Sequence, residues 1–402
     1  KIVFFLINYN IKENDLDSLI KLYKPEYIIK PNDLNFNFSF LEFRNINSKY
    51  HILKTNFKIY KVQKKLALLL STSGSTGSPK FVKISYLNLS DNTKKISEFL
   101  KISDTDKTIT TLQPNYVYGL SIINSHLIKG ALIVLCQRSL VEKKFWDLFK
   151  KTKVTSFGGV PYTYNLLKKL RFDKMRLPSL KYITQAGGKL NSELLDEFHL
   201  LCKKKKIKLI IMYGQTEATG RISYLDWNHL NKKKGSIGKP IKGGFFFLFD
   251  KQKNLVSKKL NYGELVYTGK NVMLGYALNK TDLNKDNYKK RLFTGDIAKK
   301  DNDGFYFIEG RNNRFIKIIG HRFNLDEIES ELRTNKFDCI CSGHEDLLKI
   351  FSENKISYKK LSDFLMSKFN IRKLNFSIFN NVKFPRNENG KILYEKLNMD
   401  IK

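Results

Sequence analysis

The stretch from residue 130 to residue 213 alternates strand-like and helix-like segments, and this alternation constrains the fold more than any other feature. Short apolar runs alternate with segments whose apolar side chains repeat at helical spacing. A series of this kind is typical of a doubly wound, mostly parallel sheet with helices on both faces. Strands are expected at 131–136, 154–157, 180–184 and 208–212, and helices at 142–151, 162–170 and 192–205.

Glycine-bearing loops follow three of these expected strands. They are Gly158-Gly159-Val160-Pro161, Gln185-Ala186-Gly187-Gly188 and Tyr213-Gly214-Gln215-Thr216-Glu217. In open α/β sheets, ligands bind beyond the carboxyl ends of the strands. One glycine pair would indicate only a tight turn. Three such loops at one sheet edge predict a ligand crevice.

The run Leu70-Ser71-Thr72-Ser73-Gly74-Ser75-Thr76-Gly77-Ser78-Pro79-Lys80 is a second informative feature. It offers backbone N–H groups, hydroxyls and one cation, which are groups that bind a polyphosphate. The Walker A core Gly-Lys-Ser/Thr is absent, because Pro79 precedes Lys80 and Phe81 follows it. A strand–loop–strand hairpin therefore fits better than a strand–loop–helix unit. A flexible Ser/Gly-rich surface loop is the alternative.

The remaining segments complete an α/β fold class. Residues 1–65 are expected to supply one strand–helix–strand unit, and 235–310 a small antiparallel β subdomain. After Gly310-Arg311, an α+β tail is expected, with a strand at 314–319, a helix capped by Asn324, a helix at 357–369 and a strand at 376–383. We therefore predict a large N-terminal domain over 1–311 and a small mobile C-terminal domain over 312–402, with a hinge near 312–313.

Composition excludes several function classes. The 402 residues carry a formal net charge of +35, which suggests nucleic acid or an anionic surface as partner. Lysine is spread over every segment, however, so we expect no specific nucleic-acid partner. No apolar run approaches the roughly 20 residues of a membrane span. The four cysteines lack C-x-x-C spacing, and the histidines form no zinc signature. A reduced, cytoplasmic protein is expected.

Six motifs, in this order along the chain, resemble those of the adenylate-forming (AMP-binding) superfamily, which includes acyl-CoA synthetases, peptide-synthetase adenylation domains and luciferases. They are the phosphate loop Ser71–Lys80, the Y-G-x-T-E motif Tyr213–Glu217, Gly263-Glu264-Leu265, Thr294-Gly295-Asp296, the segment Gly310–Glu329, and Asn389-Gly390-Lys391-Ile392. The resemblance covers nearly the whole chain.

The resemblance implies an AMP-forming carboxylate ligase. A carboxylic acid, fatty or otherwise not an α-amino acid, would react with Mg-ATP to give acyl-AMP and pyrophosphate. A thiol, either coenzyme A or the phosphopantetheine of an acyl carrier protein, would then take the acyl group, as in fatty acid metabolism. The alternative is a non-catalytic nucleotide- or acyl-binding relative, or an inactive fragment.

The resemblance also assigns roles to residues. Lys391, Thr216 and Glu217 would be catalytic, with Glu217 holding Mg²⁺. Tyr116 and Val160 would form the acyl gate, Gly320, His321 and Arg322 the loop for the thiol step, and Asn313 the hinge. The nucleotide would bind Ser71, Thr72, Ser73, Gly74, Ser75, Thr76, Gly77, Lys80, Gly187, Gly188, Tyr213, Gly214, Gln215, Asp296 and Arg311.

Departures from the family pattern bear on the substrate. The segment 113–120 contains no acid, which disfavours an α-amino acid, because a buried ammonium without a counter-charge is costly. Tyr116 stands where many CoA ligases carry histidine, and Asn313 replaces a charged hinge residue. The part before the phosphate loop is short, so we expect either a fragment, starting at Lys1 rather than Met, or a compact variant.

Overall fold

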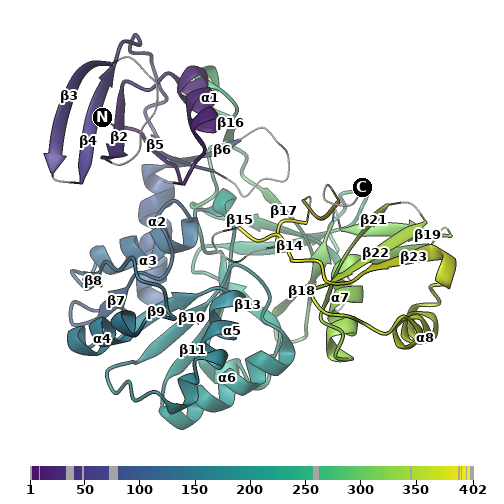
Figure 1. Ribbon diagram of the computed structural model, residues 1–402. Coiled ribbons are helices and arrows are strands. Elements are labelled where there is room, and N and C mark those ends of the chain that lie inside the picture. Colours follow the sequence, from purple (N-terminus) through teal and green to yellow (C-terminus); the bar gives the residue numbers. More distant parts are fainter. Residues whose placement is uncertain are drawn as a thin grey trace.

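The structure is a computed structural model, and it describes residues 2–8, 10–32, 40–47, 49–71, 80–256, 262–312, 314–319, 321–344, 346–387, 390, 392–394 and 396–398. Within these residues the largest sheet has eleven strands and runs through the large body of the molecule (Figure 1). In spatial order its strands are β14 (Phe245–Phe249), β15 (Gly263–Thr268), β17 (Leu292–Lys300), β18 (Tyr306–Arg311), β13 (Ser236–Pro240), β12 (Ser223–Leu225), β11 (Lys208–Tyr213), β10 (Tyr182–Gln185), β9 (Ser156–Gly159), β7 (Lys107–Ile109) and β8 (Leu132–Val134).

One end of this sheet is the parallel part that the alternating segments predict. Strands β8, β7, β9, β10 and β11 are parallel neighbours. The described helices are α1 (Glu13–Tyr23), α2 (Tyr86–Phe99), α3 (Val117–Leu127), α4 (Lys143–Thr152), α5 (Pro161–Lys169), α6 (Ser192–Lys205), α7 (Leu325–Thr334) and α8 (Tyr358–Phe369). Helices α4, α5 and α6 cover one face of the parallel part and α3 covers the other, which agrees with the expected α/β arrangement, whereas β7, α2 and α3 were not among the expected elements.

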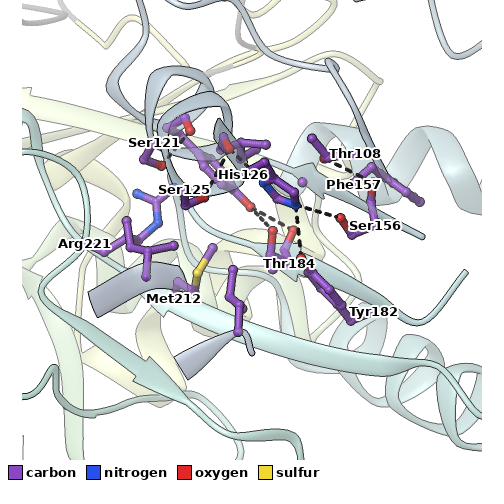
Figure 2. Close-up of a pocket in the computed structure, with 15 residues that line it drawn as sticks. Thr108, Ser121, Ser125, His126, Ser156, Phe157, Tyr182, Thr184, Met212 and Arg221 are labelled. Atoms are coloured by element: carbon purple, nitrogen blue, oxygen red, sulfur yellow. Dashed lines mark hydrogen bonds between the residues drawn. The ribbon is translucent and has the colours of Figure 1, made fainter. Parts of the chain in front are cut away.

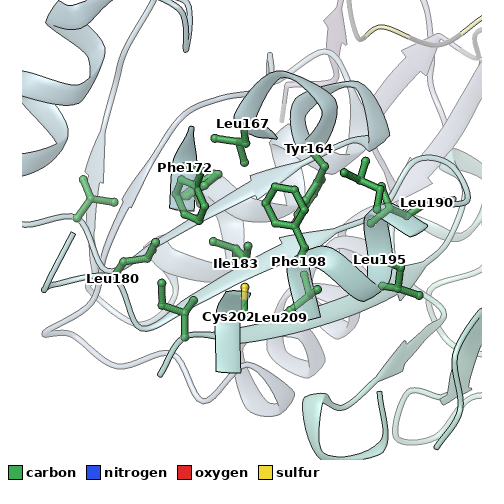
Figure 3. Packing of buried hydrophobic residues seen from close by; sticks show 14 of the residues in the cluster. Tyr164, Leu167, Phe172, Leu180, Ile183, Leu190, Leu195, Phe198, Cys202 and Leu209 are labelled. Carbon is green, nitrogen blue, oxygen red and sulfur yellow. The ribbon is translucent and has the colours of Figure 1, made fainter. Parts of the chain in front are cut away.

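Alternate residues along the strands belong to two separate hydrophobic cores, one on each face of the sheet. Ile183 and Leu209 point toward α4, α5 and α6, where they meet Tyr164 and Phe198 (Figure 3). Their neighbours Tyr182 and Ile210 belong to the core on the other face, which α3 covers with Tyr118. This alternation follows from the period of two along a strand. Each large apolar side chain buried here contributes about 1.5–3 kcal/mol.

The antiparallel strands expected within 235–310 form, but they do not stand apart as a separate sheet. Strand β12 pairs antiparallel with β11, and β13 then joins β12 to β18. The parallel and antiparallel parts therefore share one mixed sheet. Because backbone hydrogen bonds continue across the junction, residues from both parts are held rigidly beside each other.

The predicted hairpin around the Ser/Gly run is confirmed. Strands β5 (Leu66–Ser71) and β6 (Phe81–Ser85) are antiparallel, with Ser71 opposite Phe81. They lie between β1 (Phe4–Leu6) and β16 (Tyr276–Ala277) in a four-stranded sheet. The expected strand–helix–strand start is β1, α1 and β2 (Tyr27–Pro31), to which β3 (Phe40–Asn47) and β4 (Tyr50–Thr55) add a three-stranded sheet, β2-β4-β3.

The tail after Arg311 folds around its own core, as predicted. A hairpin of β19 (Phe315–Ile318) and β20 (His321–Asn324) leads into α7, and the Asn324 side chain caps α7 by accepting from the Asp326 N–H. Strands β21 (Cys339–His344), β22 (Leu347–Ser352) and β23 (Phe376–Phe379) form a sheet packed with α7 and α8. No helix among the described residues is long and apolar enough to cross a membrane.

Candidate active site

The three glycine-bearing loops meet at one edge of the sheet, because β9, β10 and β11 are parallel neighbours. The β10 loop is closed by the buried Gln185 side chain, which donates to the Gly188 carbonyl at 2.8 Å. In the β11 loop, a Cβ on Gly214 would overlap the Gly220 carbonyl. This close approach requires glycine at position 214 and folds residues 214–220 into a compact turn.

A cluster at this edge is centred on Asp296, which accepts from Tyr213 and pairs with Arg311. Asp296 on β17 lies opposite Arg311 on β18, and Arg311 Nε is 3.0 Å from Asp296 Oδ1. The Tyr213 hydroxyl donates to Asp296 Oδ2. The Asp296 side chain is 4% exposed, whereas half of the Arg311 side chain is exposed. The structure thus brings together three predicted nucleotide-binding residues from three strands.

The electrostatics of this cluster follow from its pairing. The Asp296 carboxylate raises the pKa of Arg311, and burial, with Asp296 second, raises the pKa of Tyr213 well above its ordinary value. Tyr213 therefore stays a neutral donor and Arg311 a cation. A carboxylate has about four lone-pair positions, so Asp296 keeps acceptor capacity for hydroxyls such as those of a ribose.

A second group joins Glu217, Tyr276 and Lys80. Glu217 Oε1 accepts from the Tyr276 hydroxyl at 2.9 Å, and Lys80 Nζ lies 3.9 Å from the centre of the Tyr276 ring. Strand β16 carries Tyr276 and pairs with β6, the strand that follows Lys80. Tyr276 therefore connects Lys80, at the end of the Ser/Gly run, to Glu217 in the β11 loop. Thr216 starts the same short turn as Glu217.

Glu217 fits a magnesium ion that arrives with a nucleotide. Mg²⁺ is usually held by one or two carboxylates together with phosphate oxygens and waters. Among the described residues, no three His, Cys, Asp or Glu side chains gather as a metal cage. One carboxylate positioned by Tyr276, with Lys80 nearby, matches the nucleotide-borne ion rather than a permanently bound one.

The predicted acyl gate lies against the β10 loop. A Cβ on Gly187 would overlap the Tyr116 hydroxyl and lie 3.1 Å from Val160 Cγ1. Tyr116 precedes α3, and Val160 precedes α5. The two gate residues therefore converge on the loop assigned to the nucleotide.

Behind this gate, a cavity lies between α2, α3 and the parallel strands (Figure 2). Its volume is about 10 Å³. Tyr118 donates to the Thr184 carbonyl at 2.9 Å. His126 Nδ1 lies 2.8 Å from the Ile122 carbonyl, so Nδ1 carries the proton and Nε2 accepts from Ser156 and Tyr182 at 3.3 Å.

The C-terminal segment reaches this side of the molecule. A Cβ on Gly390 would lie 2.6 Å from Tyr162 Cβ, so the residue beside Lys391 packs on the start of α5. Arg314 ties the segment to α7 and packs against the Tyr394 ring with Cζ 3.6 Å from its centre. Strand β19, whose partner β20 begins at His321, lies on the outer side of the C-terminal unit, away from β11 (Figure 1).

Several predicted site residues lie outside the described residues. These are Thr72, Ser73, Gly74, Ser75, Thr76, Gly77, Asn313, Gly320 and Lys391, and the side chain of Arg322. Ser71 and Lys80 bound the Ser/Gly run and are described. Gln215 is described through its carbonyl, which accepts from the Gly220 N–H at 3.2 Å.

Comparison with known proteins identifies the family. The family model of AMP-binding enzymes matches residues 37–277, which is more than half of the chain. The chain belongs to the AMP-binding enzyme family.

Members of the AMP-binding family resemble the chain over most of its length. The oxalate–CoA ligase of Saccharomyces cerevisiae is 26% identical, covering 92% of this chain and 69% of the relative. The 2-succinylbenzoate–CoA ligase of Bacillus licheniformis is 27% identical, covering 82% and 69%. The o-succinylbenzoate CoA synthetase of Bacillus subtilis, solved with ATP and a magnesium ion, has a TM-score of 0.71 at 25% identity, covering 86% and 73%.

Three site residues escaped the motif search. Tyr276 gave no signal, because its contact with Glu217 depends on the pairing of β16 with β6. Tyr118 resembled an ordinary core aromatic. Arg221 had a visible signal, because it is a charged residue four positions after Glu217 in an otherwise small and apolar stretch.

Proposed function

We propose that the protein activates a carboxylic acid with Mg-ATP and transfers the acyl group to coenzyme A. The observation that carries the proposal is the paired cluster of Tyr213, Asp296 and Arg311, next to Glu217 and Lys80 at one sheet edge. This arrangement offers acceptors for ribose hydroxyls, a carboxylate for Mg²⁺ and a cation for phosphate.

In the first step, a carboxylate oxygen of the acid attacks the α-phosphorus of ATP. The new bond joins the acid to the adenylyl group, and the bond to the β-phosphate oxygen breaks, releasing pyrophosphate. Asp296 and Arg311 would hold the ribose side of the nucleotide, and Glu217 would hold Mg²⁺, which would supply positive charge to offset that of the phosphates. Such positioned charges stabilise the transition state most where charge develops.

Lys391 supplies the mobile cation of this step. The residue before it, Gly390, packs on Tyr162 at the start of α5, on the acyl side of the sheet edge. We propose that the lysine that follows Gly390 bridges the carboxylate of the acid and the α-phosphate. The Ser/Gly run from Ser71 to Lys80 holds the outer phosphates through its backbone N–H groups.

In the second step, the thiol sulfur attacks the acyl carbon and AMP leaves. We propose that residues 312–402 move as one domain about Asn313 between the steps. Strand β20, which begins at His321, lies away from β11 in this structure (Figure 1). After the movement, Gly320, His321 and Arg322 would face the acyl-adenylate. A short connection between two separately packed cores suits such a closure. An acidic carrier protein is a second possible acceptor, given the basic surface.

The acid is not an α-amino acid. No aspartate or glutamate is among the residues lining the cavity, and Arg221 puts a positive charge there. A substrate ammonium in that space would be both unpaired and repelled. Nine of the cavity-lining side chains carry a hydroxyl, imidazole or guanidinium group, which also disfavours a long hydrocarbon chain: Thr108, Tyr118, Ser121, Ser125, His126, Ser156, Tyr182, Thr184 and Arg221.

The test is acid-dependent release of pyrophosphate from Mg-ATP over a panel of carboxylic acids. Glu217→Gln and Lys391→Ala should each lower the rate by about 10²-fold, since each removes a charge that acts in the transition state. Hydroxylamine should trap the acyl group in the wild type. ATP binding without pyrophosphate release for every acid would overturn the proposal.

A further inference from the structure

Arg221 is buried without a charged partner. Its residue is 2% exposed, and among the described residues no carboxylate lies within ion-pair distance of it. Nη1 donates to the Gly220 carbonyl at 2.8 Å, whereas Nε and Nη2 have no hydrogen-bond partner. An arginine is always charged in proteins, so these donors belong to a buried cation.

The guanidinium is held in place rather than left loose. Its Cζ lies 3.9 Å from the centre of the Tyr118 ring. The Arg221 backbone carbonyl accepts from Asn92 Nδ2 at 2.7 Å and from Asn271 Nδ2 at 3.1 Å. Two buried asparagines from distant segments thus fix the residue that carries the unpaired donors.

The free donors belong to the cavity behind the acyl gate. Arg221 lines it together with Ser121 and Ser125 of α3 and Met212 of β11 (Figure 2). The other polar groups drawn there, including Tyr118 and His126, have partners. Arg221 is therefore the described lining residue whose side-chain nitrogens still lack partners.

A buried charge of this kind is costly unless something pairs with it. The described residues supply no carboxylate to Arg221, so we infer that a ligand supplies the missing partner. Two residues that line the cavity, Tyr118 and Tyr182, pack in one cluster with the gate residues Tyr116 and Val160, so the cavity adjoins the gate. A ligand with its reacting carboxylate at that gate would place its far end near Arg221.

We propose that Arg221 binds a second anionic group of the substrate, and that the preferred acids are short dicarboxylic acids. This inference rests on the proposed activation of a carboxylic acid and names the class of that acid. The guanidinium fork matches a carboxylate in a bidentate way. The cavity is small and its lining is rich in hydroxyls, which favours a short acid with an anionic end group over a hydrocarbon tail.

The experiment compares acids of equal length that differ in one end group. Succinate, glutarate and adipate are paired with butanoate, pentanoate and hexanoate, and kcat/KM is measured by pyrophosphate release. We expect the wild type to prefer the diacid of its best length by at least about tenfold. In Arg221→Met this diacid-to-monoacid ratio should fall by about 10²-fold, because a desolvated charge pair is lost.

Two further variants separate recognition from folding. Arg221→Lys keeps a charge but not the fork, and should recover part of the ratio. Arg176→Met makes the same substitution at an exposed arginine and should leave the ratio unchanged. Because the readout is a ratio, a general loss of stability in Arg221→Met lowers both acids and does not imitate the expected result.

The outcomes separate the two proposals. Pyrophosphate release with no diacid preference, or a ratio unchanged in Arg221→Met, overturns the Arg221 inference while the ligase function stands. No release with any acid overturns the proposed function. In that case, calorimetric titration of the wild type and Arg221→Met with succinate, glutarate and adipate still tests the site, and equal binding to both proteins contradicts it.

Discussion

Arg311 and Arg221 stand on the same mixed sheet, but the protein treats their charges in opposite ways. Arg311 ends β18 and is paired with Asp296, which also accepts from Tyr213. Arg221 precedes β12, is more deeply buried, and has two nitrogens without partners. At Arg311 the protein itself supplies the partner of the buried carboxylate and fixes the geometry of the site. Arg221 has the chemistry of a site that a ligand completes.

The difference follows from what each region has to recognise. A nucleotide is the same in every turnover, so its ribose site can be fixed in advance by internal ion pairs. An acyl pocket sets specificity, and a charge left unpaired there penalises every ligand that cannot neutralise it. The predictions below test these two arrangements, from the largest expected effect to the smallest.

Removal of Asp296 should have the largest effect. Asp296→Ala leaves the half-exposed Arg311 and the buried Tyr213 hydroxyl without their shared acceptor and removes the acceptor proposed for the ribose, and each hydrogen bond to a charged group contributes about 1.5–3 kcal/mol. We expect kcat/KM for ATP in pyrophosphate release to fall by about 10²–10³-fold. Asp173→Ala removes a carboxylate from the exposed pair with Arg171 and should change the rate by less than about twofold. A mild effect of Asp296→Ala would show that the pairing does not position the nucleotide.

Glu217→Gln should have the next largest effect, and this effect, unlike that of Asp296→Ala, should depend on the Mg²⁺ concentration. The amide keeps the shape but loses the charge that suits Mg²⁺, so the Mg²⁺ concentration for half-maximal rate should rise along with the roughly 10²-fold loss in rate. Glu197→Gln, at an exposed carboxylate paired with Lys168, is the matched control. A rate loss that does not depend on Mg²⁺ would contradict the metal role.

The contrast between these regions also shows what the sequence could predict. Local patterns found the parallel strands β8, β9, β10 and β11, the helices from α4 to α8 and the β5–β6 hairpin, because each depends on a few consecutive residues. They did not single out β7, α2 or α3. Helix α6 has the predicted bounds, with Asn191 accepting from Leu194 N–H at its start. The motif residues Tyr213, Asp296 and Arg311 were named from sequence, and the structure brings them into direct contact.

What the sequence could not predict depends on pairing across long separations. The antiparallel strands join the parallel sheet through β12, a three-residue strand that no pattern singled out. Tyr276 reaches Glu217 only because β16 pairs with β6. The absence of a partner for Arg221 is a statement about everything packed around it, which spacing along the chain does not contain.

Gly390 offers a test of how the C-terminal segment meets the acyl side. Gly390 has φ +73°, and a Cβ there would meet Tyr162. Gly390→Ala should lower pyrophosphate release by about tenfold, through backbone strain of about 1–2 kcal/mol and displacement of the segment. Gly304 has φ +82° with its nearest neighbours at 3.8 Å, so Gly304→Ala carries similar strain without the contact. Equal activity losses in the two variants would contradict a role for the Gly390–Tyr162 contact.

His126 should make the acyl pocket sensitive to acid. Burial lowers the pKa of His126, although the Ile122 carbonyl and Asp106 oppose the shift. Below pH 6.5 the unfolded chain binds a proton that the folded chain does not, so stability is lost as pH falls from 6.5 toward the lowered pKa. The free energy of unfolding should lose up to about 1.4 kcal/mol per pH unit from this group.

The variant His126→Gln should remove that part of the slope, measured by urea unfolding between pH 5 and pH 7. His344→Gln changes an exposed histidine and should keep the wild-type slope. The same slope in His126→Gln and the wild type would mean that His126 is not held neutral. The result bears on the comparison of the two regions, because a neutral His126 leaves Arg221 as the positive charge of the described cavity lining.

Tyr276→Phe should have the smallest effect. It removes the hydroxyl that donates to Glu217 at 2.9 Å but keeps the ring that Lys80 covers. A single hydrogen bond to a charged group contributes about 1.5–3 kcal/mol when nothing replaces it, and water reduces the loss at a half-open site. We therefore expect a fall of about 3- to 10-fold in pyrophosphate release. The Mg²⁺ requirement should rise, as in Glu217→Gln, but by less.

Tyr306→Phe is the control, because it removes a hydroxyl bonded to the Phe246 carbonyl, away from Glu217, and should leave the Mg²⁺ requirement unchanged. If Tyr276→Phe matched Tyr306→Phe, Glu217 would be positioned without help from the protein. The nucleotide edge would then resemble the Arg221 pocket in leaving a charge for the ligand to place.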